Sequence, residues 1–80
     1  MILHIGDIVI LEGSNWGMAS VGTRGRVVPP EYKSNDKMVG IEWEGCSTIH
    51  HAMADRDHPN ATAGSYRIRV IQPAVICEND

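Results

Sequence analysis

The chain has no phenylalanine, and its two tryptophan and two tyrosine residues make up only 5% of the 80 residues. Its core therefore has to be filled by isoleucine, valine, leucine and tryptophan. No stretch approaches the roughly 20 consecutive apolar residues that a membrane-spanning helix needs, so no membrane partner is expected. Cys46 and Cys77 are too few for a disulfide scaffold, and the absence of an export signal leads us to expect a cytoplasmic protein.

Basic residues are also scarce. Seven lysine and arginine residues stand against ten aspartate and glutamate residues, which gives a net charge of -3. This balance argues against a protein that coats nucleic acid with its whole surface, because such proteins carry an excess of positive charge. A chain of 80 residues has room for a single core. We therefore expect one domain over residues 1–72 and a C-terminal tail over residues 73–80.

What the chain does contain is a series of short β-strand patterns. Residues 6–11 form a β-branched run, and residues 22–28 end at two prolines, which cannot continue a strand ladder. Residues 37–43 and 66–71 alternate between apolar and polar side chains, and residues 46–53 form a weaker fifth pattern. Eight glycines and four prolines interrupt the chain, and no helical pattern of useful length occurs. These patterns indicate an all-β fold.

Five short strands are too few for a two-sheet sandwich, but they can close into a small, strongly bent barrel. We therefore predict a five-stranded, SH3-like barrel with a long first loop over residues 12–21 and a second loop over residues 29–36. Glu44 and Gly45 are expected to form a tight hairpin between the third and fourth strands. An extended loop over residues 54–65 leads into the last strand.

Short motifs carry a resemblance to two families. Residues 6–10 (GDIVI) and 22–28 (GTRGRVV) resemble the opening Gly-Asp-x-Val and Gly-x-x-Gly-x-Val strands of KOW-type barrels. Residues 15–17 (NWG), 41–45 (IEWEG) and 66–67 (YR) are similar to the Trp-Gly loop, hairpin and closing Tyr-Arg of mind-bomb-type barrels. Both resemblances imply an SH3-like fold, and the KOW-type resemblance also implies binding to RNA or DNA.

The arginines form the first candidate site. Two pairs, each two residues apart, lie in predicted strands: Arg24 and Arg26, Arg67 and Arg69. The period of two sends them to the outer face, and in an SH3-like order both strands flank the first strand. The four guanidinium groups would then share one side and bind phosphate or an acidic protein surface. Alternatively, they form weak cross-strand pairs with nearby acids.

The aromatic residues form the second candidate site. Trp43 lies on the apolar face of its predicted strand and is expected in the core. Trp16 and Tyr32 lie in the two long loops, which face each other across a groove in SH3-like barrels. The pair is then suited to stack on a peptide or a base. Alternatively, Trp16 folds back and plugs one end of the barrel.

Cys46, His50 and His58 are weaker candidates for a zinc site. Thiolate and imidazole are the usual zinc ligands, but no Cys-x2-Cys pair is present, and a solvated histidine-rich loop is the alternative. No cofactor is expected. The serines lack a Gly-x-Ser-x-Gly context, and so small a chain has little interior for a catalytic pocket. We therefore expect no enzyme activity.

The tail contains an apolar run over residues 73–77. It predicts a sixth edge strand, or self-association by pairing with another chain, and the alternative is a disordered tail. Taken together, the residues predict a non-catalytic protein-binding module, a small accessory or inhibitor protein that docks on a larger partner. The alternatives are a KOW-like nucleic-acid-binding domain that uses the outer arginines and a small zinc-binding domain.

Overall fold

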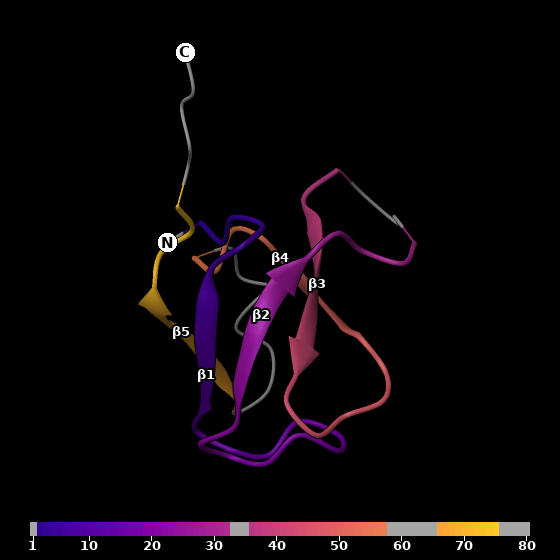
Figure 1. Cartoon of the computed structure of the whole chain (residues 1–80), viewed down its shortest axis with the longest axis vertical. Coiled ribbons are helices and arrows are strands. Elements are labelled where there is room, and N and C mark those ends of the chain that lie inside the picture. Colours follow the sequence, from indigo (N-terminus) through magenta and orange to yellow (C-terminus); the bar gives the residue numbers. More distant parts are fainter. Residues whose placement is uncertain (1, 33–35, 58–65, 76–80) are drawn as a thin grey trace.

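The computed structural model describes residues 2–32, 36–57 and 66–75 and has five strands (Figure 1). They are β1 (Ile8–Glu12), β2 (Arg24–Val28), β3 (Met38–Trp43), β4 (His50–Met53) and β5 (Arg67–Gln72). All pairings are antiparallel, and the strands form one sheet in the order β4-β3-β2-β1-β5. The described residues contain no helix. The all-β prediction is confirmed.

The sheet curls into a half-barrel, with β4 and β5 at its two edges (Figure 1). The N-terminal segment extends the pairing past the end of β4. Ile2 forms a bridge with Asp55, and the Leu3 amide donates a hydrogen bond of 2.7 Å to the Ala54 carbonyl. The start of the chain thus lies against the segment that follows β4.

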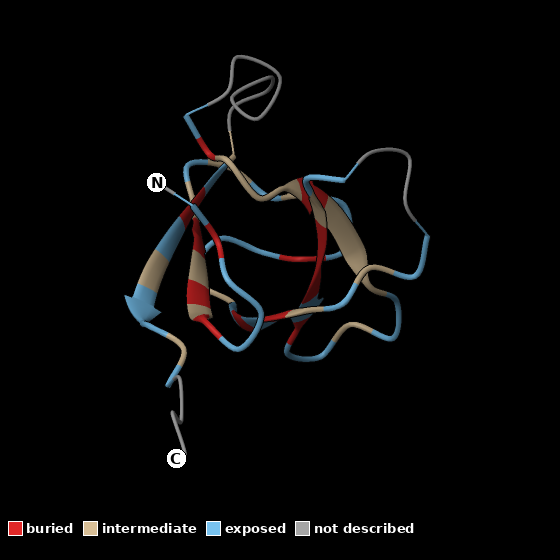
Figure 2. Cartoon of the chain, turned by 90° about the horizontal axis from the view of Figure 1, so that it is seen from above, coloured by how far each residue is buried: buried red, intermediate tan, exposed pale blue. Residues whose placement is uncertain are grey.

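The concave face of the half-barrel holds the core (Figure 2). Strands β1 and β2 bury alternate residues, as a pleated strand with one solvated face requires. Trp43 is 1% exposed, which confirms its predicted place in the core. A Cβ at Gly25 would lie only 2.7 Å from Cε3 of Trp43, so only glycine lets the indole ring pack against β2. The buried apolar residues are Leu3, Val9, Leu11, Ala19, Val27, Val39, Ile41, Trp43, Ala52 and Ile68.

The connection between β3 and β4 is longer than predicted. A turn does form at Glu44 and Gly45, where Gly45 has a φ of +83°. The chain does not enter β4 there, however, because β4 begins only at His50. Ile49 instead lies against the glycine of β3, with its Cγ2 2.8 Å from where a Cβ of Gly40 would stand. The expected tight hairpin is therefore a six-residue connection over residues 44–49.

The end of β5 is attached to the start of β1 by a buried carboxylate. Asp7 is only 3% exposed, and it accepts a hydrogen bond of 2.7 Å from the Ala74 amide and one of 2.9 Å from the His4 amide. Residues 73–75 form no strand. The rest of the edge strand predicted at residues 73–77, including Cys77, lies outside the described residues.

Candidate functional site

Four arginines lie on the convex side of β2 and β5, the two strands that flank β1. β2 and β5 both pair with β1, and Ile10 of β1 has Arg24 on one side and Arg69 on the other. Two residues before Ile10 on β1, Ile8 lies opposite Arg26 of β2. Two residues after Ile10, Glu12 lies opposite Arg67 of β5. All four arginines are exposed. We give the name arginine face to eight of the outward residues of these strands: Ile8, Ile10, Glu12, Arg24, Arg26, Arg67, Arg69 and Ile71.

Two of these arginines form exposed ion pairs. Arg69 Nε lies 2.9 Å from Glu12 Oε2, and Arg26 Nη2 lies 3.5 Å from Oε1 of Glu42 on β3. The side chains involved are 41% to 59% exposed, so each pair stabilises the fold by only about 0–1 kcal/mol. No ion pair joins Arg24 or Arg67 to another of the described residues. Two of the four arginines thus form the pairs with nearby acids that the sequence offered as one alternative.

The charge of this face is opposite to that of the whole chain. Its four arginines, with Glu12 and the neighbouring Glu42, have a net charge of +2, whereas the chain has a net charge of -3. The remaining residues therefore carry a net charge of -5. Charge separation of this kind orients a molecule toward an acidic partner before contact is made.

Between the arginines runs an apolar stripe. Ile8 and Ile10 are half-buried along β1, although they point away from the core. A β-bulge between the partners of Ile8 and Val9 leaves Ile71 of β5 as an extra residue, and it is 36% exposed. The arginine face thus offers both cationic and apolar groups.

A second group of side chains lies on the concave side of the sheet and closes the half-barrel. The Trp16 ring stacks on Tyr66 with a centroid distance of 4.4 Å and an interplanar angle of 6°. It also meets Trp43 at 6.4 Å and His50 at 4.8 Å, both edge to face. We call Trp16, Trp43, His50 and Tyr66 the aromatic cluster. Because Trp16 packs on the core in this way, the structure favours its role as a plug.

Arg56 extends this cluster between the two edges of the sheet. It follows β4, and Tyr66 immediately precedes β5. The guanidinium carbon lies 5.9 Å from the centroid of the Tyr66 ring, a cation–π distance. Burial lowers the pKa of Arg56 from its usual value, and the charge and hydroxyl of Tyr66 act in the opposite direction. Sequence reasoning missed this contact, because Arg56 stands between two aspartates in a stretch that reads as solvated.

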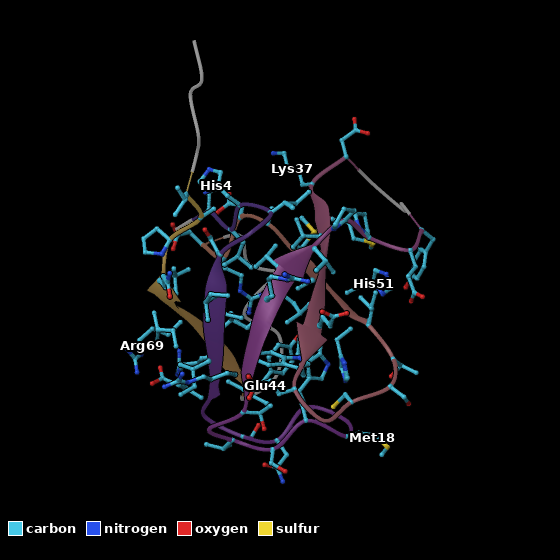
Figure 3. The ribbon with its side chains drawn as sticks, in the orientation of Figure 1. His4, Met18, Lys37, Glu44, His51 and Arg69 are labelled. Carbon is cyan, nitrogen blue, oxygen red and sulfur yellow. The ribbon has the colours of Figure 1, made fainter. Side chains whose placement is uncertain are left out.

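The tip of the first loop turns Trp16 inward and Met18 outward. Trp16 and Ala19 exchange two backbone hydrogen bonds of 2.9 Å, and Gly17 between them has a φ of +58°, which favours glycine. Met18 is 82% exposed at this turn. Figure 3 shows Met18 at the side of the molecule opposite Arg69. The loop tip is therefore separate from the arginine face.

Tyr32 lies on the other side of β4 from Trp16. The neighbours His50 and His51 point to opposite faces of the strand, as the pleat requires. Trp16 contacts His50, whereas Tyr32 contacts His51 at a centroid distance of 4.3 Å. Nε2 of His51 also accepts a hydrogen bond of 3.0 Å from the Glu31 amide. The two rings therefore do not face each other across one groove, and that geometric expectation was wrong.

The candidate zinc ligands form no three-ligand site with other residues of the described part of the chain. His50 belongs to the aromatic cluster, where it contacts Trp16, and its Nδ1 is buried without a hydrogen-bond partner among the described residues. Cys46 is half-buried beside the core, and His58 lies outside the described residues. Within residues 2–32, 36–57 and 66–75, no three histidine, cysteine or acidic side chains gather closely enough to hold a metal ion.

Comparison with known proteins assigns no family. The chain matches no protein-family model, no curated protein and no solved structure. Nowhere in the described ranges is there a helix long and apolar enough to cross a membrane. Any functional assignment therefore depends on the chemistry of the surfaces described above.

Proposed function

We propose that the chain is a non-catalytic protein-binding module, a small accessory or inhibitor protein that docks on a larger partner through the arginine face. The observation that supports this proposal is the pattern of cationic rows beside an apolar stripe on an acidic chain. Guanidinium groups bind carboxylates in a bidentate manner, and an apolar stripe gives a partner surface from which water is excluded. An acidic protein surface can form both kinds of contact.

The arginines carry this proposal more strongly than the loop aromatics do. The Trp16 ring already stacks on Tyr66 and makes edge contacts with Trp43 and His50. Tyr32 is 60% exposed, but it lies over β4, away from β1 and β5. We therefore assign the primary contact to Arg24, Arg26, Arg67 and Arg69, and we assign Tyr32 at most a secondary contact.

We also propose that the half-barrel is a member of the SH3-like barrels. Two features support this assignment: β2 and β5 flank β1, and a long loop separates β1 from β2. Both features agree with the KOW-type and mind-bomb-type motifs in the sequence.

Binding of RNA or DNA is the second candidate function, because four exposed arginines on one face are suited to phosphate. Two observations make it the weaker candidate. Ile8 and Ile10, half-buried between the arginine rows, gain no apolar contact from a phosphate backbone. In addition, neither Trp16 nor Tyr32 lies on this face, so neither provides it with a ring that stacks on a base.

Two single charge reversals test the proposed function. Arg24→Glu changes the arginine face, whereas Lys37→Glu makes the same change in net charge at the exposed residue that precedes β3. Affinity purification from the source cells, with and without nuclease, is done with the unmodified chain and both variants. We expect a protein partner that survives nuclease and is lost only with Arg24→Glu. Equal retention by both variants would contradict the proposal, and loss on nuclease treatment would favour the nucleic-acid alternative.

A further inference from the structure

We infer that the arginine face binds an amphipathic helix of the partner protein, with an apolar stripe bordered on both sides by aspartate or glutamate. This inference rests on the proposed function, because it names the kind of segment that the same face would bind. It follows from the spacing of the face, from the width of its apolar stripe and from the charges beside it.

The two arginine rows have the separation that a helix needs. Arg24 and Arg26 stand on β2, and Arg67 and Arg69 stand on β5, with one strand between them. Because neighbouring strands lie about 4.8 Å apart, the rows are about 10 Å apart. A helix with its side chains is about 10–12 Å across. A helix that lies along β1 therefore brings the carboxylates of its two flanks over the two rows.

The stripe between the rows has the matching apolar spacing. Ile8 and Ile10 are two residues apart on β1, which corresponds to about 6.7 Å along the strand. Apolar residues four apart on a helix are separated by about 6 Å along its axis. Ile71 widens the stripe on the side of β5. A helix with apolar residues at i and i+4 can thus cover the stripe while its flanks reach the arginines.

An extended peptide fits the face less well. Successive side chains of a strand point to opposite sides, so a peptide with its apolar residues on Ile8 and Ile10 would point its acidic residues into solvent. A nucleic-acid duplex would leave Ile8 and Ile10 without an apolar contact, because its outer surface is a charged phosphate backbone. Of these three partners, the helix is the one that can contact the apolar and the cationic groups together.

The arginines are available for exchange. Arg24 and Arg67 form no ion pair with any other residue in the described ranges, and both lie toward the end of β1 that carries Glu12. The pairs of Arg26 and Arg69 are exposed and therefore weak, so a partner carboxylate can replace Glu42 or Glu12. We expect the first carboxylate contacts at Arg24 and Arg67.

Three synthetic peptides of about 15 residues serve as probes, since that length spans roughly 22 Å as a helix. The first has leucines at i, i+4, i+7 and i+11 with glutamates on both borders of the stripe. The second has the same composition in scrambled order, and the third has lysine in place of glutamate. Calorimetry measures affinity, and amide shifts of the full chain locate the contact.

We expect the first peptide to bind at least about tenfold more tightly than the other two and to shift amides of β1, β2 and β5. Arg24→Glu should weaken the affinity for the first peptide by about tenfold. Ile10→Thr should also weaken this affinity, while circular dichroism shows that the fold is retained. Lys37→Glu should leave the affinity unchanged. Equal binding of the scrambled peptide, or shifts confined to another surface, would overturn the helix inference. Tighter binding of a short DNA duplex than of the first peptide would overturn it as well.

The two proposals can fail separately. If no peptide binds but a cellular protein is still lost with Arg24→Glu, the arginine face binds a protein segment of another shape, and only the helix inference falls. If the cellular partner is also retained by Arg24→Glu, the proposed function falls with it.

Discussion

The arginine face and the aromatic cluster lie on opposite sides of one sheet, and they differ in how their side chains are held. The Trp16 ring contacts three other rings, and its loop is closed by paired backbone hydrogen bonds. The arginines are exposed, and two of them form only weak ion pairs. Contacts on the concave side therefore maintain the fold, whereas under the proposed function the weak contacts on the convex side would be exchanged for those of a partner.

The largest expected effect is that of Trp16→Ala. It removes a stacked ring and two edge contacts, and such truncations cost about 3–5 kcal/mol. A chain of this length has a total stability of only about 4–12 kcal/mol, so much of the fold should be lost. The matched control is Tyr32→Ala, which loses one contact at an exposed position. Urea denaturation measures both, and equal midpoints would mean that Trp16 is not a plug.

The next effect separates the two faces of a single strand. Gly25→Ala puts a Cβ 2.7 Å from the Trp43 ring and 2.9 Å from the Glu42 carbonyl oxygen, so the indole or the backbone has to move. We expect a loss of about 1–3 kcal/mol in the free energy of unfolding. Arg24→Ala, one residue away on the outer face, should change it by less than about 0.5 kcal/mol. Similar losses for both variants in thermal denaturation would contradict this contrast.

A smaller effect distinguishes the adjacent histidines. His51→Ala removes the acceptor of the Glu31 amide and the ring under Tyr32, at an exposed part of the sheet. We expect faster amide exchange at Glu31 and a global cost of about 0.5–1.5 kcal/mol. His50→Ala, on the concave side, should cost more and leave Glu31 exchange unchanged. Slower or unaltered exchange at Glu31 in the His51 variant would show that this hydrogen bond does not hold the second loop.

The smallest effect is the coupling between Arg69 and Glu12. A double-mutant cycle with Arg69→Ala and Glu12→Ala should give a coupling of about 0.2–1 kcal/mol. The coupling should decrease as salt is added, because exposed charges are screened. The same cycle between Arg24 and Glu12 provides the baseline. A coupling well above this range that salt does not reduce would make the arginine face a structural element instead of an exchangeable surface.

The local pattern of the chain was enough to predict the strands and the side on which most of their residues lie. Residues 22–28 and 37–43 were predicted as strands and contain β2 and β3, and the alternation of Arg67, Ile68 and Arg69 predicted their faces. This works because the period of two is a property of the strand backbone. The weaker pattern over residues 46–53 contains β4, but the strand begins only at His50. No local signal in the sequence shows that Ile49, just before it, packs on Gly40.

The order of residues along the chain is enough to specify an all-β fold whose two arginine pairs point away from the core. Which aromatic rings come into contact follows from the folded arrangement of the loops. Trp16 and Tyr32 are equivalent as aromatic residues in polar loops, yet one contacts His50 and the other His51. The contact of Arg56 with Tyr66 could not be predicted from the sequence either. The physical reason is that strand periodicity is a local property, whereas these contacts depend on the path of loops and on the curvature of the whole sheet.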